Sequence, residues 1–132
     1  TLLEANGKWW LFTTIKERNS WDILNLYSAD HPFSDDWIPH PRNPIVKDIH
    51  SARPAGRIFC HNGELIRPSQ DCSVRYGYAI NFNRISALTD SEYQETAEWF
   101  LEPPAGSNIF GTHTWNQADG LTIIDAFVRR KK

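Results

Sequence analysis

The sequence has no methionine, only two cysteines and no long apolar run. No stretch approaches the roughly 18 consecutive apolar residues that a transmembrane helix needs. The first residues, Thr1-Leu2-Leu3-Glu4, lack the basic region and the apolar core of a signal peptide. These absences predict a protein without membrane contacts, and the missing methionine leads us to expect that the original start has been removed.

The chain also lacks a strong charge imbalance. Fourteen basic residues stand against sixteen acidic ones, which gives a net charge of −2. The one basic run comprises residues 129–132 at the end of the chain. Because nucleic-acid-binding domains carry a basic surface, this balance argues against a nucleic-acid partner.

Motifs for metals, cofactors and nucleophilic catalysis are missing as well. The sequence has neither a glycine-rich phosphate loop nor the G-x-S-x-G motif of serine hydrolases. Its histidines do not follow metal-binding spacings such as H-E-x-x-H. We therefore expect no metal and no cofactor; the histidines concerned are His31, His40, His50, His61 and His113.

The two cysteines are too few for a disulfide-based fold. We interpret Cys60 and Cys72 as reduced thiols of a cytoplasmic protein. If the Asn62-Gly63 pair forms a hairpin turn, Cys60 faces a residue near position 65 and not Cys72. A direct bridge between them is therefore not expected.

The sequence is instead rich in aromatic residues and turn formers. It contains six Trp, seven Phe and four Tyr, together with eight Pro and seven Gly. A chain of 132 residues corresponds to one domain. The composition predicts a well-packed, turn-rich domain made mainly of β-strands.

Three short turn motifs recur at a constant spacing. Asn6-Gly7, Asn62-Gly63 and Asp119-Gly120 each lie between strand-like segments, and their glycines are 56 and 57 residues apart. Such dipeptides are the strongest short-range signal of a β-hairpin. Third strands are predicted at 23–29 and 76–82, again about 54 residues apart. The chain therefore contains a repeated antiparallel unit.

A fourth strand is predicted at 93–100. The glutamates of 91–99 recur every three residues and also fit one face of an amphipathic helix. The repeat favours the outer strand of a four-stranded unit.

Four-stranded units repeated about every 50 residues are typical of β-propeller blades. The segments 9–14 and 121–128 are apolar on both faces, as expected for strands covered on both sides. The fold class is thus all-β, with about two and a half four-stranded antiparallel blades at 1–50, 51–105 and 106–132.

The alternative is a single β-sandwich with long loops. Open blade edges promote association, so we expect another copy of the chain, or a missing propeller half, to cover them.

Several motifs together resemble a known family. They are Trp9-Trp10-Leu11-Phe12, His40-Pro41-Arg42-Asn43-Pro44, the block from Ser51 to Phe59, the block from Asn62 to Ser73 followed by Tyr76-Gly77, and Gly111-Thr112-His113-Thr114. This set resembles the glucosamine inositolphosphorylceramide transferase-like domain. The resemblance implies a five-bladed propeller related to arabinanase and xylosidase-type glycoside hydrolases, and in some proteins joined to a formyltransferase or glycosyltransferase domain. The chain corresponds to about the second half of such a domain.

The catalytic pair of the hydrolases is not transferred to this chain. A glycosidase needs two carboxyl groups about 5 to 9.5 Å apart. In the hydrolase relatives these acids lie mostly on the innermost strands of the earlier blades, and Glu4 lies too near its turn to replace one. The catalytic residues are therefore unknown, and we expect the chain alone not to be an enzyme.

Six polar residues are the candidates for ligand binding. Arginine side chains can bind a phosphate with two hydrogen bonds, Gln and Asp pair with sugar hydroxyls, and a tyrosine ring can stack on a sugar. Alternatively, the arginines and the aspartate form a buried ion-pair network and the glutamine bonds to the backbone. The candidates are Arg53, Arg67, Gln70, Asp71, Tyr76 and His113.

These observations leave three hypotheses for the function. The first is a non-catalytic or incomplete carbohydrate-active propeller module that binds a glycan or a sugar phosphate. The second is a glycoside hydrolase-like or glycosyltransferase-associated domain that is active only with the missing blades. The third is a structural fragment that self-associates.

Overall fold

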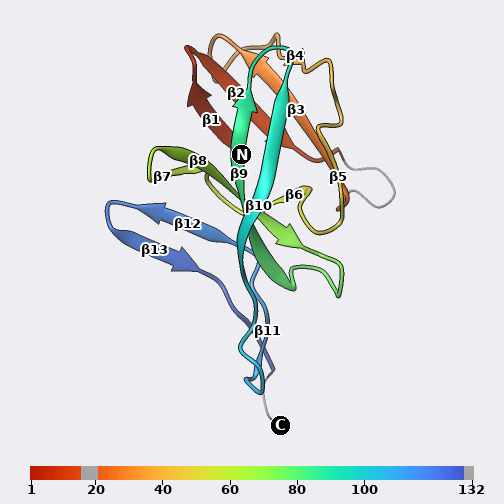
Figure 1. Ribbon diagram of the computed structural model, residues 1–132, viewed down its shortest axis with the longest axis vertical. Helices are drawn as coiled ribbons and strands as arrows, with labels where there is room; N and C mark the ends of the chain where they lie inside the picture. Colours follow the sequence, from red (N-terminus) through yellow and green to blue (C-terminus); the bar gives the residue numbers. More distant parts are fainter. Residues whose placement is uncertain (16–20, 130–132) are drawn as a thin grey trace.

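The computed structural model describes residues 1–15 and 21–129. Every regular element within these ranges is a β-strand, and the strands pair antiparallel (Figure 1). The predicted all-β class is therefore confirmed. None of the described residues belongs to a helix that could cross a membrane. Residues 130–132, which end the basic run, lie outside the described ranges.

The first sheet is a meander in which each strand pairs with the next. The last position of the meander is shared by two short strands, which both pair with β3. The predicted third strand at 23–29 is confirmed as β3. The strands are β1 (Leu2–Ala5), β2 (Lys8–Thr13), β3 (Ile23–Ala29), β4 (Ile38–Pro39) and β5 (Val46–Lys47).

The second sheet is a similar meander, except that two short strands share its first position. Two short strands pair with β8, which is followed by β9 and then by β10 at the outer edge. The segment 91–99 is thus mainly the predicted outer strand, not a helix. The strands are β6 (Arg53–Pro54), β7 (Phe59–His61), β8 (Glu64–Asp71), β9 (Ala79–Leu88) and β10 (Tyr93–Leu101).

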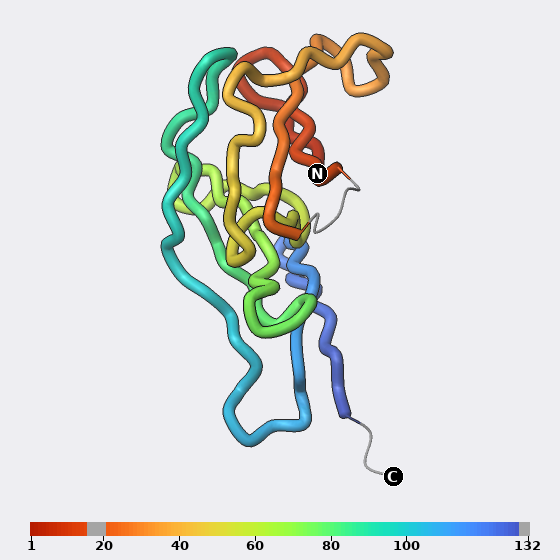
Figure 2. Tube along the Cα trace, turned by 90° about the vertical axis from the view of Figure 1, so that its right-hand side faces the viewer, coloured from red at the N-terminus to blue at the C-terminus, as the bar shows by residue number. Residues whose placement is uncertain are grey.

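The remaining strands form one interrupted hairpin, which we call the third unit. It comprises β11 (Ile109–Gly111), β12 (Trp115–Ala118), β13 (Leu121–Ile124) and β14 (Phe127–Val128). The outer part pairs β12 with β13, and the inner part pairs β11 with β14. Figure 2 shows the first sheet at one end of the long axis and the connection between β10 and β11 at the other.

All three predicted turns are present and share one conformation. The first residue of each pair has a φ of +50° to +55° and the glycine a φ of +73° to +84°. Two successive positive φ angles define the type I′ turn, which matches the twist of a β-hairpin. Asn, Asp and Gly tolerate these angles best, so the turn sequences alone fix the three hairpins.

The central strands of the second sheet, β8 and β9, are covered on both faces, whereas most of β10 is exposed. Leu65 and Ile85 contact the core shared with the first sheet, which is built around Trp10 and Phe12. The opposite face carries a second core, formed by Ala55, Ile66, Ile80 and Phe82, with Trp115 of the third unit packed against it. Successive residues of β8 therefore point to different neighbours.

The third unit differs from the prediction of strands covered on both sides. Every residue of β13 is exposed, and Leu121 and Ile123 are 62% and 60% exposed. Nothing in the described part of the chain pairs with its free edge. The same part of the chain contains no closed sheet, so the propeller stays a prediction.

Both cysteines are free thiols. Cys60 is exposed, and its cross-strand partner is Leu65, as predicted. Cys72 is buried, and burial raises the pKa of its thiol.

Candidate functional site

The six predicted site residues separate onto the two faces of the second sheet. Arg67 and Asp71 lie two positions on either side of Ser69 and share the face toward the first sheet. Arg53 is the cross-strand partner of Gln70, so both lie on the other face. Side chains alternate along a strand, and this alternation divides the set.

Arg53, Tyr76 and His113 come together at one end of the second sheet; together with Trp21 we call them the aromatic cluster. The Arg53 guanidinium lies 5.0 Å from the centre of the Tyr76 ring, and its Nη2 donates to the Tyr76 hydroxyl at 3.3 Å. The Tyr76 ring stacks at a tilt on His113 and on Trp21, with centroid distances of 5.1 and 5.2 Å. Tyr76 and Trp21 remain exposed, so a ligand can reach the cluster.

A glycine permits the contact between Tyr76 and His113. Gly77 has a φ of +59°, and a Cβ there would lie 1.8 Å from Cδ2 of the His113 ring. Any other residue would therefore be strained and would displace the imidazole. Position 77, next to Tyr76, therefore needs a glycine for His113 to keep its place.

Asp125 holds His113 from the third unit. Its carboxylate accepts hydrogen bonds from the backbone N–H groups of His113 and Thr114 at 2.6 and 2.8 Å, and from His113 Nδ1 at 2.7 Å. It lies where the pairing between β11–β14 and β12–β13 is interrupted. Burial alone would raise the pKa of Asp125, but these hydrogen bonds outweigh it and lower that pKa.

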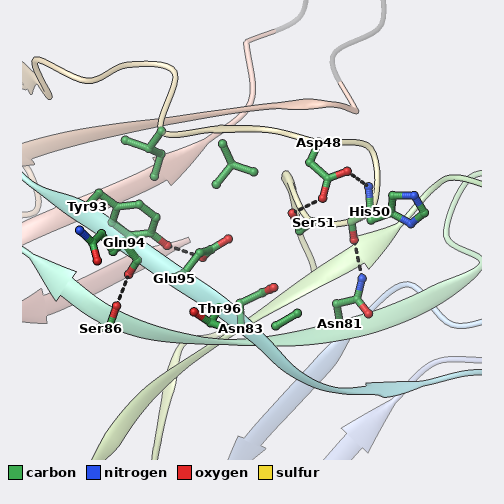
Figure 3. Close-up of a pocket in the computed structure, with 13 residues that line it drawn as sticks. Asp48, His50, Ser51, Asn81, Asn83, Ser86, Tyr93, Gln94, Glu95 and Thr96 are labelled. Carbon is green, nitrogen blue, oxygen red and sulfur yellow. Dashed lines mark hydrogen bonds between the residues drawn. The ribbon is translucent and has the colours of Figure 1, made fainter.

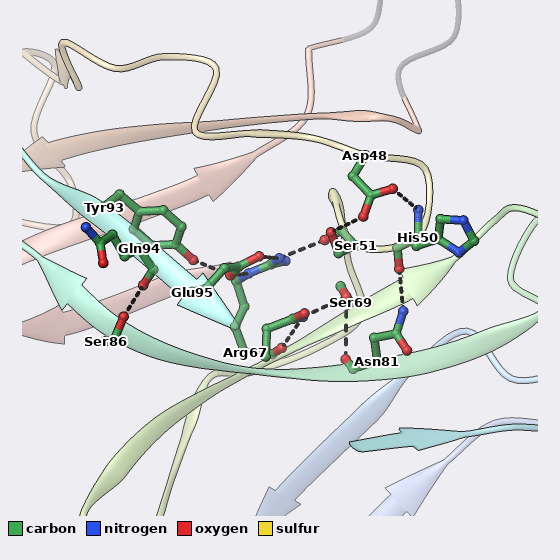
Figure 4. Close-up of polar contacts among 11 residues, drawn as sticks. Asp48, His50, Ser51, Arg67, Ser69, Asn81, Ser86, Tyr93, Gln94 and Glu95 are labelled. Atoms are coloured by element: carbon green, nitrogen blue, oxygen red, sulfur yellow. Dashed lines mark hydrogen bonds and ion pairs between the residues drawn. The ribbon is translucent and has the colours of Figure 1, made fainter. Parts of the chain in front are cut away.

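Arg67 lies on the opposite face, and protein groups bind its Nε and Nη2 atoms. It forms a two-pronged ion pair with Glu95, at 2.7 Å from Nε and 2.5 Å from Nη2, and Nη2 also donates to the carbonyl of Ser51 (Figure 4). The Tyr93 hydroxyl donates to the same carboxylate. Burial alone would lower the pKa of Arg67, but the charge of Glu95 outweighs it and raises that pKa. Burial also raises the pKa of Tyr93.

The other two candidates have local partners. Gln70 is buried, and its amide donates to the carbonyl of Pro54 at 3.5 Å. Asp71 pairs with His50 Nδ1 at 3.1 Å and accepts from the backbone of Ser73 at 2.8 Å. Burial would raise the pKa of Asp71, yet hydrogen bonds from Ser73 and His50 lower it, and the bond to Asp71 raises the pKa of His50.

A polar groove lies above Arg67, between the 45–51 segment and strands β9 and β10 (Figure 3). It has a volume of about 540 Å³. Ser51, Tyr93 and Glu95, the partners of Arg67, all belong to its walls. The full lining is Ile45, Val46, Asp48, His50, Ser51, Asn81, Asn83, Ser86, Tyr93, Gln94, Glu95, Thr96 and Ala97.

Sequence reasoning missed Glu95, Asp125 and Trp21. Glu95 was one of three regularly spaced glutamates, and a bulge between Gln94 and Glu95 interrupts the pairing register there. The signal for Asp125 was a lone acid inside the apolar segment 121–128. Trp21 had no local signal, because its contact with Tyr76 joins distant parts of the chain. Among the described residues, no group of three or more His, Cys, Asp and Glu side chains is arranged to hold a metal.

Comparison with known proteins gives consistent matches. The family described as "Glucosamine inositolphosphorylceramide transferase 1, N-terminal" matches residues 1–122. A protein named glucosamine inositolphosphorylceramide transferase 1 from Oryza sativa subsp. japonica is 36% identical over 100 residues, covering 72% of this chain and 13% of the relative. The protein of that name from Arabidopsis thaliana is 37% identical over 123 residues, covering 88% of this chain and 15% of the relative. The chain thus spans a small part of these relatives, and no solved structure gives a significant match.

Proposed function

The chain belongs to the glucosamine inositolphosphorylceramide transferase 1 N-terminal family, and on that basis we propose that it is a sugar-phosphate-binding module associated with a glycosyltransferase-type protein. The aromatic cluster is the proposed binding site. The names of the relatives include the word inositolphosphorylceramide, which describes a phosphate beside an inositol ring. A site for such a group needs a cation to bind the phosphate and an aromatic surface to contact the ring.

The observation that carries this proposal is the guanidinium of Arg53, which forms an ion pair with none of the described residues. Arg67, in contrast, is neutralised by Glu95. Arg53 Nε is buried and has no hydrogen-bond partner among the described residues. A phosphate oxygen would satisfy a guanidinium of this kind with a charge-assisted bond.

The aromatic rings supply the second half of the proposed site. Tyr76 is 43% exposed and Trp21 is 40% exposed. Flat rings of this kind can pack against the apolar face of a sugar or cyclitol ring. We propose that the ring of the ligand packs on this surface while its phosphate reaches Arg53.

The nearby carboxylates favour binding over hydrolysis. A glycosidase needs a general acid whose pKa is raised. The pKa values of Asp71 and Asp125 are lowered, because both carboxylates accept several hydrogen bonds. The alternative, a glycoside hydrolase-like or glycosyltransferase-associated domain that is active with further blades, would need an acid other than Asp71 and Asp125.

The five-bladed propeller remains our proposal for the finer architecture. Two meanders with the same strand order support it, as does the covering of β8 and β9 on both faces. In a two-layer sandwich, one face of each sheet would be exposed to water.

Titration with inositol 1-phosphate, followed by calorimetry or NMR, tests the binding proposal. We expect Arg53→Ala to weaken binding at least about tenfold, because a charge-assisted hydrogen bond contributes about 1.5–3 kcal/mol. Tyr76→Ala should weaken it less. Arg42→Ala, at an exposed arginine of the connecting segment, is the matched control and should leave affinity unchanged.

Equal affinity of wild type and Arg53→Ala would overturn the proposal. Thermal unfolding of both proteins accompanies the titration. If Arg53→Ala unfolds, Arg53 is structural, and Arg53→Lys then tests whether a positive charge alone restores binding.

A further inference from the structure

The polar groove is separate from the aromatic cluster. Arg53 lies on the face of the second sheet that carries Ile66 and Ile80, whereas the groove opens on the face that carries Asn81 and Asn83. β8 and β9 stand between them. A ligand in the groove would therefore contact a different set of side chains.

The size and lining of the groove suit a small hydroxyl-rich molecule. Its volume of about 540 Å³ lies within the range of about 300 to 1,000 Å³ of small-molecule sites. Ten of its thirteen lining residues are polar, and the apolar ones are Ile45, Val46 and Ala97. An apolar ligand would leave the polar walls without hydrogen-bond partners.

Hydrogen bonds hold these walls in place. The Asn81 amide donates to the carbonyl of His50 at 2.7 Å, and the Ser51 hydroxyl donates to Asp48 at 2.8 Å (Figure 3). Asn83 is fully buried and donates to the Ser69 hydroxyl at 2.8 Å. A ligand would thus enter a preformed site.

The groove retains free hydrogen-bonding groups. The side-chain carbonyl oxygens of Asn81 and Asn83 take part in no hydrogen bond of the described residues. The Asp48 oxygens each accept one bond and keep further lone pairs. These acceptors match the hydroxyl groups of a sugar.

The charges of the groove disfavour an anionic ligand. Arg67 beneath it is neutralised by Glu95, so its charge is not available to a phosphate. Asp48 adds a negative charge to the wall. Arg67 Nη1 is buried without a partner in the described part of the chain, and a ligand oxygen could serve it.

We infer that this groove is a second binding site, which takes a neutral polyol ring such as a sugar or a cyclitol. The inference goes beyond the proposed sugar-phosphate site because a different face, different residues and a different ligand charge are involved.

Titration of the full chain with myo-inositol and with D-glucose, monitored by NMR of the isotopically labelled protein, tests the inference. We expect saturable shifts of the Asn81, Thr96 and Ala97 amides. Ala97 is the cross-strand partner of Asn83 and lies on the groove face, so Ala97→Trp should fill the groove and weaken this binding at least about tenfold. Ala118→Trp, at an exposed alanine of β12, is the matched control and should bind like wild type.

The two sites are distinguished by exchanging ligands and variants. Arg53→Ala should leave polyol binding unchanged, and Ala97→Trp should leave binding of inositol 1-phosphate unchanged. The inference is overturned if neither polyol shifts the groove signals, if Ala97→Trp binds as wild type does, or if Arg53→Ala abolishes polyol binding.

Discussion

Strands β8 and β13 follow equivalent turns but have opposite surroundings. Each is the second strand of a hairpin closed by Asn-Gly or Asp-Gly, and each contains two adjacent apolar residues, Leu65-Ile66 in β8 and Ile123-Ile124 in β13. β8 pairs on both sides and is buried over most of its length. β13 pairs only with β12 among the described strands and is exposed throughout. Turn and composition thus specify the hairpin, whereas burial depends on neighbours.

The largest effect on stability is expected when Glu95 of β10, the counter-ion of the buried Arg67 of β8, is removed. Glu95→Ala leaves a buried guanidinium without its counter-ion, and we expect a loss of about 3–5 kcal/mol in the free energy of unfolding. Urea unfolding measures it. Glu98→Ala, on the same strand as Glu95, removes one of the two surface carboxylates that pair with Arg84, the other being Glu64, and should cost about 0–1 kcal/mol. Equal losses for both variants would contradict the structural role assigned to Glu95.

Matched isoleucine substitutions compare the two strands directly. Ile66 of β8 is 1% exposed, so Ile66→Ala should lower the free energy of unfolding by about 3 kcal/mol. Ile123 of β13 is 60% exposed, so Ile123→Ala should change it by less than about 0.5 kcal/mol. Denaturant unfolding at low protein concentration measures both.

The same pair tests the expectation that another copy covers the open edge. If β13 is covered in a dimer, the cost of Ile123→Ala should rise with protein concentration, because association stabilises the folded state. Sedimentation velocity over a concentration series reports the oligomeric state. A monomer at every concentration would contradict self-association.

A smaller effect on stability is expected from Asp125, which accepts hydrogen bonds from His113 and Thr114 within the third unit. Asp125→Asn removes a charged acceptor from three hydrogen bonds at a partly exposed site, and we expect a loss of about 1 kcal/mol at pH 7. The folded pKa of Asp125 is lowered, so its contribution is present above the ordinary value of 3.8 and is lost as the pH falls below it. Wild type and Asp125→Asn should therefore differ at pH 7 and converge near pH 2. A difference that persists in acid would show that the carboxylate charge is not responsible.

Local sequence signals predicted the parts of the fold that depend on few residues. The three turns, strand β3 and the outer strand β10 follow from backbone preferences and periodicity. The exposure of β13 could not be predicted, because apolar composition does not state what covers a strand. The closure of a propeller stays a prediction.

The candidate site was predicted only in part. Arg53, Tyr76 and His113 meet in the structure, although they lie up to 60 residues apart in the sequence. Arg67 lies on the other side of the sheet, which follows from counting positions along β8 and β6 once their register is known. The partners Glu95 and Asp125 depend on tertiary contacts that no local pattern encodes.

The alternation of side chains along β8 makes the second sheet a partition between two compartments. A substitution at an even-numbered position from 66 to 70 alters the side next to Arg53, and one at an odd-numbered position from 65 to 71 alters the side next to the groove. Because the two sides share backbone but not side chains, a substitution can alter one of the two proposed sites while the other is retained. A single sheet thus lets the two proposed sites change independently.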